Sequence, residues 1–138
     1  MKIILLLLLC ALNIQAANFD QYCEALAKVE SSNNPRAYNA NENAIGLYQI
    51  RAAYFKDAQA FDPDLKGYSH KDCFTPAVGK RVVWAYAARY EPSALRKMDV
   101  EVLAKLHNGG VKWQDKDGRA KKNLEIYWAK VRKYLTGR

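Results

Sequence analysis

The sequence predicts one mostly helical domain of the α+β class, with a small extended element near its N-terminal end. Three observations carry this prediction. Apolar residues recur at helical spacing through most of the chain, the one extended pattern is confined to residues 44–50, and 138 residues suffice for one core but not for two. Without a repeat or a long linker in the sequence, we divide it into a leader, residues 1–16, and one domain, residues 17–138.

Residues 1–16 have the composition of an export signal peptide. A basic start precedes an apolar run over residues 3–12, and the small residues Ala16 and Ala17 suit a signal peptidase. The apolar run is shorter than the roughly 20 residues that a membrane-spanning helix needs. We therefore expect cleavage near Ala17 and a periplasmic or extracellular protein without stable membrane insertion. An uncleaved anchor and lipidation of Cys10 are the alternatives.

Cleavage of the leader would leave Cys23 and Cys73 as the cysteines of the mature chain. An even number of cysteines in an oxidising compartment favours a disulfide between them. Closing a loop of about 50 residues would stabilise the fold by roughly 4 kcal/mol in the chain-entropy description. The alternative is a pair of buried free thiols.

The chain is basic, with a formal net charge of +8 at pH 7. An exported basic protein first meets the anionic polymers of the cell envelope, such as glycan strands, teichoic acids and lipopolysaccharide. Nucleic acid would suit the same charge, but the sequence holds no nucleic-acid motif and export argues against it. We expect a monomer that binds an envelope polymer, and a merely solvated basic face is the alternative.

The first helix is predicted over residues 19–30, with Asn18 or Asp20 as its cap. The polar run 31–35 ends it, which places Glu30 at the C-terminal end on the core-facing side. The helix dipole and burial both oppose a negative charge there. Cleavage of a glycosidic bond needs an acid of this kind, although periodicity alone favours a salt-bridged or partly exposed glutamate.

Four later helices follow from start and stop signals. Thr75 before Pro76 is a strong start, because threonine caps a helix and proline suits its first position. Asp99 can cap the next helix, which the Asn108–Gly110 run closes. We predict helices over residues 54–61, 76–90, 100–107 and about 123–135.

Several motifs follow one another in a specific order. Glu30-Ser31, the segment 34–37 (NPRA) and the segment 44–50 (AIGLYQI) resemble the catalytic part of soluble lytic transglycosylases, which belong to the lysozyme-like superfamily with the goose-type lysozymes. Downstream segments are similar to invertebrate-type lysozymes and their bacterial and phage relatives. These are residues 54–57, 85–90, 103–110 and 127–131. The resemblance implies a lysozyme-like fold and a glycosidase that cleaves peptidoglycan.

The resemblance also implies roles for individual residues. Glu30 matches the family acid, which protonates the oxygen between N-acetylmuramic acid and N-acetylglucosamine. Without the family order, Ser31 would be read as a turn residue, Gly109 as a helix stop and Tyr127 as core. The positions that match residues near the acid or the sugars are Ser31, Tyr48, Gln49, Asn108, Gly109 and Tyr127.

A second carboxylate would decide the reaction type. A retaining hydrolase places one about 5 Å from the acid, and an inverting hydrolase places it further away. Invertebrate-type lysozymes carry an aspartate at the position of Asn39, so the resemblance favours a single-acid transglycosylase that forms 1,6-anhydromuramyl ends. A hydrolytic lysozyme is the alternative, with Glu42 as the possible second carboxylate and Asp57 or Asp72 as further candidates.

Two non-enzyme alternatives remain, a catalytically silent glycan-binding domain and a basic protein that acts by charge alone. We predict no metal and no cofactor. The segment from Asp62 begins like a calcium loop, but Cys73 occupies the twelfth position, where a glutamate is needed, and a turn is favoured. His70 and His107 lack zinc-ligand spacing.

Overall fold

The computed structural model describes residues 17–136, and within them the mostly helical α+β class is confirmed. Six α-helices and three short 3₁₀ helices accompany one two-stranded antiparallel sheet, which follows the first helix as expected. The elements are α1 Phe19–Ser31, β1 Tyr38–Asn39, β2 Ala44–Ile45, α2 Ala52–Phe61, η1 Pro63–Leu65, η2 His70–Phe74, α3 Pro76–Tyr90, α4 Pro92–Lys97, α5 Val100–Gly109, η3 Trp113–Asp115 and α6 Gly118–Thr136.

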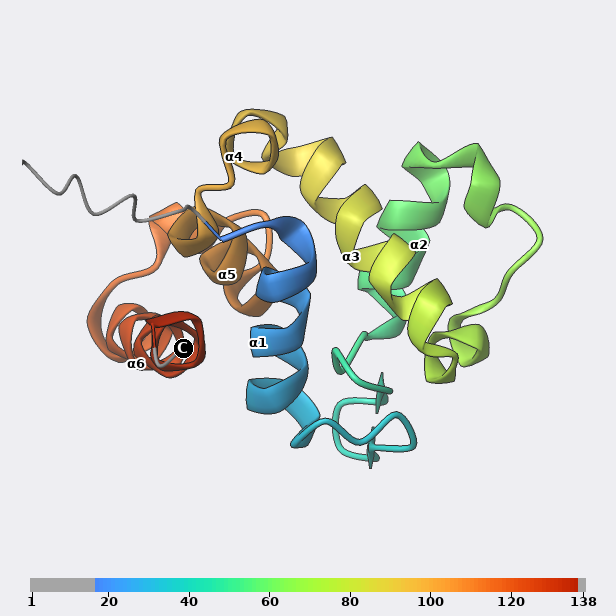
Figure 1. The fold of residues 1–138 in the computed structure, drawn as a ribbon, viewed down its shortest axis with the longest axis horizontal. Helices are drawn as coiled ribbons and strands as arrows, with labels where there is room; N and C mark the ends of the chain where they lie inside the picture. Colours follow the sequence, from blue (N-terminus) through green and yellow to red (C-terminus); the bar gives the residue numbers. More distant parts are fainter. Residues whose placement is uncertain (1–16, 137–138) are drawn as a thin grey trace, which may run out of the picture.

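Helix α1 runs through the middle of the molecule, with α5 and α6 on one side and α2 and α3 on the other (Figure 1). Helix α6 packs against both α1 and α5, and α2 packs against α3. The two ends of the described chain are therefore joined through α1 and α6. The most deeply buried side chains come from α1, α3, α5, α6 and the loops between them: Tyr22, Leu26, Ile50, Leu65, Cys73, Val82, Val83, Leu103, Leu106 and Val131.

Local hydrogen bonds fix both ends of α1. The Asn18 side chain accepts from the Gln21 N–H at 2.9 Å and the Gln21 side chain accepts from the Asn18 N–H at 3.0 Å, a reciprocal capping box. At the other end Ser32 adopts the left-handed conformation, and its N–H donates to the carbonyls of Ala27 and Lys28. The helix therefore stops directly after Glu30 and Ser31.

The turn after β2 depends on a glycine. Gly46 has a φ of +77°, and its N–H donates to the Ala37 carbonyl at 2.8 Å. A Cβ at this position would lie 2.3 Å from the Cys73 carbonyl oxygen, so no larger residue fits without displacing the backbone. Ile45 and Ile50 then pair through both backbone hydrogen bonds, and this closes the loop that carries Gln49.

The structure differs from the predicted helices in three places. Helix α2 begins at Ala52 and α6 begins at Gly118, both earlier than expected. The added residues at the start of each helix are exposed, so no buried apolar stripe marks them. Helix α4 was not predicted. Pro92 ends α3 but also occupies the first position of α4, where its missing N–H costs nothing.

Cys23 and Cys73 are free buried thiols in the structure, which corrects the expected disulfide in favour of the alternative. Burial raises the pKa of each thiol to about 12. An even number of cysteines does not establish that their Cα atoms lie within the roughly 7 Å that a disulfide requires.

The Asp62 segment forms the expected turn. Its carboxylate accepts from the Asp64 N–H and pairs with Arg81, which holds the pKa of Asp62 below its usual value. The export signal over residues 1–16 lies outside the described residues. Within 17–136, none of the helices has the length and apolar content required to cross a membrane.

Candidate active site

A groove of about 480 Å³ lies beside the C-terminal end of α1, and Glu30 lines it. Glu30 belongs to the last turn of α1, and its side chain is 18% exposed. The other lining residues come from the sheet region, α2, α3, α5 and the segment before α6: Asn39, Glu42, Gln49, Arg51, Ala53, Tyr54, Asp57, Tyr86, His107, Asn108, Gly109, Gly110 and Lys116.

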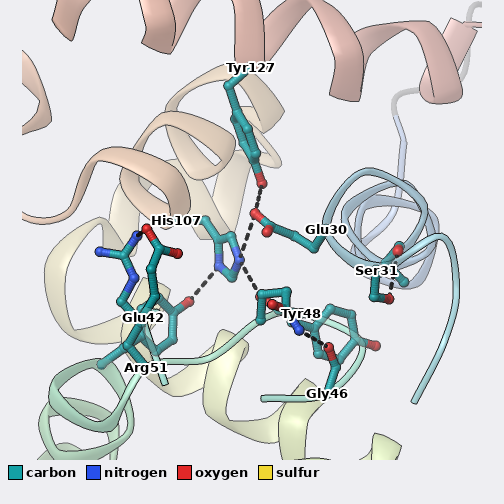
Figure 2. A network of polar contacts seen from close by, with 11 residues as sticks. Glu30, Ser31, Glu42, Gly46, Tyr48, Arg51, His107 and Tyr127 are labelled. Atoms are coloured by element: carbon teal, nitrogen blue, oxygen red, sulfur yellow. Dashed lines mark hydrogen bonds and ion pairs between the residues drawn. The ribbon is translucent and has the colours of Figure 1, made fainter. Parts of the chain in front are cut away.

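The two oxygens of the Glu30 carboxyl group differ in their surroundings. Tyr127 of α6 donates its hydroxyl hydrogen to Oε1 at 2.6 Å, and His107 Nε2 lies 3.7 Å from the same oxygen (Figure 2). Among the described residues, no hydrogen bond reaches Oε2. The protein therefore holds one oxygen of the carboxyl group and leaves the other to a ligand in the groove.

His107 is buried at the centre of this network, and its contacts identify its tautomer. Nε2 lies 3.0 Å from the Tyr48 carbonyl oxygen, which can only accept, so Nε2 carries the hydrogen. Nδ1 lies 2.9 Å from the Tyr54 hydroxyl, which then donates to it. Burial lowers the pKa of His107 and outweighs the opposing effects of Glu30 and the Tyr48 carbonyl, so the ring is neutral near pH 7.

The tyrosines around the acid remain protonated donors. Burial, followed by the charge of Glu30, raises the pKa of Tyr127 well above its ordinary value. Burial has the same effect on Tyr54, whose ring stacks on Tyr86 with centroids 3.7 Å apart. Both hydroxyls therefore keep their hydrogens and can act as donors near neutral pH.

Four of the predicted residues lie in the groove or contact Glu30. Gln49, Asn108 and Gly109 line the groove with Glu30, and Tyr127 contacts the acid directly. Gln49 has a left-handed backbone, with a φ of +51°, and its side-chain amide donates to the Gly46 carbonyl at 3.1 Å and the Ala37 carbonyl at 3.3 Å. These two bonds fix the side chain at the groove wall.

Two predicted contacts are not placed in the groove. Ser31 points away from the carboxyl of Glu30, and its hydroxyl donates to the Ala27 carbonyl and accepts from the Asn34 N–H, which are helix-end contacts (Figure 2). Tyr48 is buried, and its ring lies against Gly79 of α3. Only its backbone carbonyl reaches the network, through His107.

The candidate second carboxylates are already engaged. Glu42 and Asp57 both line the groove, but Glu42 pairs with Arg51 at 3.0 Å, and Asp57 lies 3.9 Å from Arg89. Asn39 also lines the groove, and its side chain accepts from the Asn41 N–H.

Asp72 lies outside the groove, because its carboxylate caps η2 by accepting from the N–H and the hydroxyl of Ser69. Within residues 17–136, no group of three or more histidine, cysteine or acidic side chains is arranged to hold a metal ion.

The chain is similar to known proteins in the region that carries Glu30. Residues 15–77 match the family model of the Transglycosylase SLT domain. The lysozyme-like resemblance is confirmed. The matched segment contains Glu30, the two-stranded sheet and the loop that carries Gln49, whereas His107 and Tyr127 lie beyond it.

The chain is also similar to Lysozyme 1 of Crassostrea virginica, with 29% identity over 113 residues that cover 80% of this chain. It spans 56% of the length of that relative. No solved structure matches the chain.

Proposed function

We propose that this protein is a lytic transglycosylase that cleaves the β-1,4 bond between N-acetylmuramic acid and N-acetylglucosamine in peptidoglycan. Glu30 would act first as the acid and then as the base. The observation that carries the proposal is the carboxyl group of Glu30 at the groove, held at Oε1 by Tyr127 and free of described protein contacts at Oε2. The SLT match and the similarity to a lysozyme support the same class of bond.

In the first step, Glu30 donates its proton from Oε2 to the glycosidic oxygen. Oε1 already accepts a hydrogen bond from Tyr127, so the acidic hydrogen belongs on the oxygen that faces the groove. The bond between this oxygen and C1 of the muramic acid breaks, and its electron pair leaves with the N-acetylglucosamine. The substrate's own acetamide group then stabilises the positive charge at C1.

In the second step, the Glu30 carboxylate removes the proton from the 6-hydroxyl of the muramic acid. The 6-oxygen bonds to C1, and the product is a 1,6-anhydromuramyl end. No water is consumed, and Glu30 regains its proton. Between the steps the carboxylate is stabilised by the Tyr127 hydroxyl, a donor that is in place before the reaction.

The charge arrangement favours this single-acid route over hydrolysis. Asn39 cannot activate a water molecule as a carboxylate would, and Glu42 is paired with Arg51. A hydrolytic lysozyme is the second candidate, since Glu42 and Asp57 do line the groove. A silent glycan-binding domain would retain the groove without turnover.

The test is digestion of purified peptidoglycan by the wild-type protein and by Glu30→Gln, followed by mass spectrometry of the products. We expect muropeptides lighter by one water than ordinary reducing ends, and we expect Glu30→Gln to yield none, because its amide has no acidic proton to donate. Ordinary reducing ends would establish the hydrolase. Undiminished turnover by Glu30→Gln would remove Glu30 from the mechanism.

We also propose that residues 17–138 form the exported domain, which acts as a monomer in the periplasm or outside the cell. A site for an envelope polymer supports this location, because the substrate lies outside the cytoplasm. The N-terminal residue of the secreted protein tests the cleavage site, and a start other than Ala17 or an immediate neighbour would contradict it.

A further inference from the structure

The groove contains one cation whose charge is not compensated by the protein. Of its two cationic lining residues, Arg51 pairs with Glu42 at 3.0 Å. Lys116 forms no ion pair with any residue of the described chain. The groove thus presents one acid, Glu30, and one unpaired ammonium group.

The backbone around Gly109 determines the position of Lys116. Lys116 directly follows η3 and is partly buried, whereas Lys112, at the start of the same loop, is exposed. A Cβ on Gly109 would lie 3.2 Å from Cε of Lys116 and 2.8 Å from Cβ of Trp113. The missing side chain of Gly109 therefore makes the space in which the lysine stem lies, and it holds the ammonium group beside Asn108 at the groove wall.

The chemistry of the substrate class indicates what this ammonium group meets. The sugar rings of a glycan strand are uncharged, and the carboxylates of peptidoglycan belong to the peptide arm attached to muramic acid. Removing an ammonium group from water is unfavourable unless an anion replaces the lost solvent. No described protein carboxylate pairs with Lys116, so a carboxylate of the ligand is free to pair with it when the groove is occupied.

We propose that Lys116 binds a carboxylate of the stem peptide, so that the enzyme prefers strands whose peptide carboxylates are free to strands in which they are neutralised. This inference rests on the proposed function, because it assigns the peptide arm of the same substrate to the same groove. An ion pair at a partly exposed site contributes a few-fold in affinity. We therefore expect a preference of about fivefold that depends on the charge of residue 116.

The experiment compares initial rates on strands whose peptide carboxylates are free and on strands whose peptide carboxylates have been converted to amides, which removes the charge and keeps the peptide. The measured quantity is the ratio of the two rates. We expect a ratio of about five for the wild type, a ratio near one for Lys116→Gln, and recovery in Lys116→Arg, which restores the charge. Lys112→Gln, in the same loop but outside the groove lining, serves as the matched control and keeps the wild-type ratio.

A wild-type ratio of one, or a Lys116→Gln variant with the wild-type ratio, would overturn the inference. A wild-type protein without turnover would instead contradict the proposed function. In that case the affinity of a muropeptide with free and with amidated peptide carboxylates is measured by calorimetry on the wild type and on Lys116→Gln. A preference that requires Lys116 supports the inference there too, and equal affinities reject it.

Discussion

Glu30 is held from one side only, and this asymmetry has consequences for its chemistry. Tyr127 and His107 both approach Oε1, from α6 and α5 respectively. The Tyr127 hydroxyl, which donates to Oε1, stabilises the carboxylate after it has given up its proton and leaves the other oxygen unobstructed. A donor supplied by the fold is in place before the reaction, whereas a water molecule would have to reorient.

Replacement of Tyr127 by phenylalanine tests whether the hydrogen bond to Oε1 of Glu30 contributes to catalysis. The change removes the hydroxyl that donates to Oε1 at 2.6 Å and keeps the ring. We expect kcat to fall by about 100-fold, the effect of losing one donor to a developing negative charge. Unchanged kcat would contradict the role.

How far the sequence predicted the site depends on what each residue contacts. Glu30 and Tyr127 interact through their side chains. The order of the motifs predicted both as site residues, although 97 positions separate them. His107 lies in the segment 103–110 that resembles the lysozymes, but no individual role was predicted for it. Its position in the network depends on the carbonyl oxygen of Tyr48 and the hydroxyl of Tyr54. Every residue has a backbone carbonyl, so the sequence does not show which one accepts a hydrogen bond. Periodicity likewise could not distinguish the ring of Tyr48 in the core from a ring in the groove.

At the scale of elements, start and stop signals were reliable where a side chain or a special backbone conformation acts locally. Asn18 and Asp99 cap their helices as predicted, and Pro76 begins α3. Local signals did not predict α4, because Pro92 reads equally as the end of one helix and the start of another. The predicted range of helix α6 was too short, because the first turns of the helix are polar and exposed.

The loop after β2 should tolerate no side chain at Gly46. Gly46→Ala combines a left-handed backbone with a Cβ 2.3 Å from the Cys73 carbonyl, so we expect the free energy of unfolding to fall by about 2 kcal/mol or more. Urea denaturation measures the loss. Gly67→Ala is the matched control, since nothing lies within 4 Å of its Cβ position, and it should change stability little. Equal losses in the two variants would mean that the contact with Cys73 does not matter.

At the scale of the whole molecule, buried His107 couples stability to pH. Burial lowers its pKa in the native state below the ordinary value of 6.5, which the unfolded chain retains. As the pH falls below about 6.5, the unfolded state binds a proton that the native state does not, and the free energy of unfolding decreases. The groups that face the ring, namely Glu30, Tyr54, Tyr48 and Arg51, supply no compensating protonation strong enough to reverse this direction.

Urea denaturation between pH 7.5 and pH 5 measures this coupling. We expect a loss of up to about 1.4 kcal/mol per pH unit in the wild type. His107→Gln keeps an amide that can donate to the Tyr48 carbonyl but does not titrate, so its slope should be much smaller. A slope as steep in His107→Gln as in the wild type would assign the effect to other groups. Asp62 does not interfere, because its lowered pKa affects stability only below its ordinary value of 3.8.

The contact between Glu30 and Tyr127 joins the first helix of the described chain to the last. A ribosome makes α6 last, so a growing chain holds Glu30 long before it holds the hydroxyl that orients it. Any fragment that stops before Tyr127 contains the segment matched by the family but lacks a held acid. In the proposed enzyme, the order of the sequence therefore delays the complete site until α6 has been made.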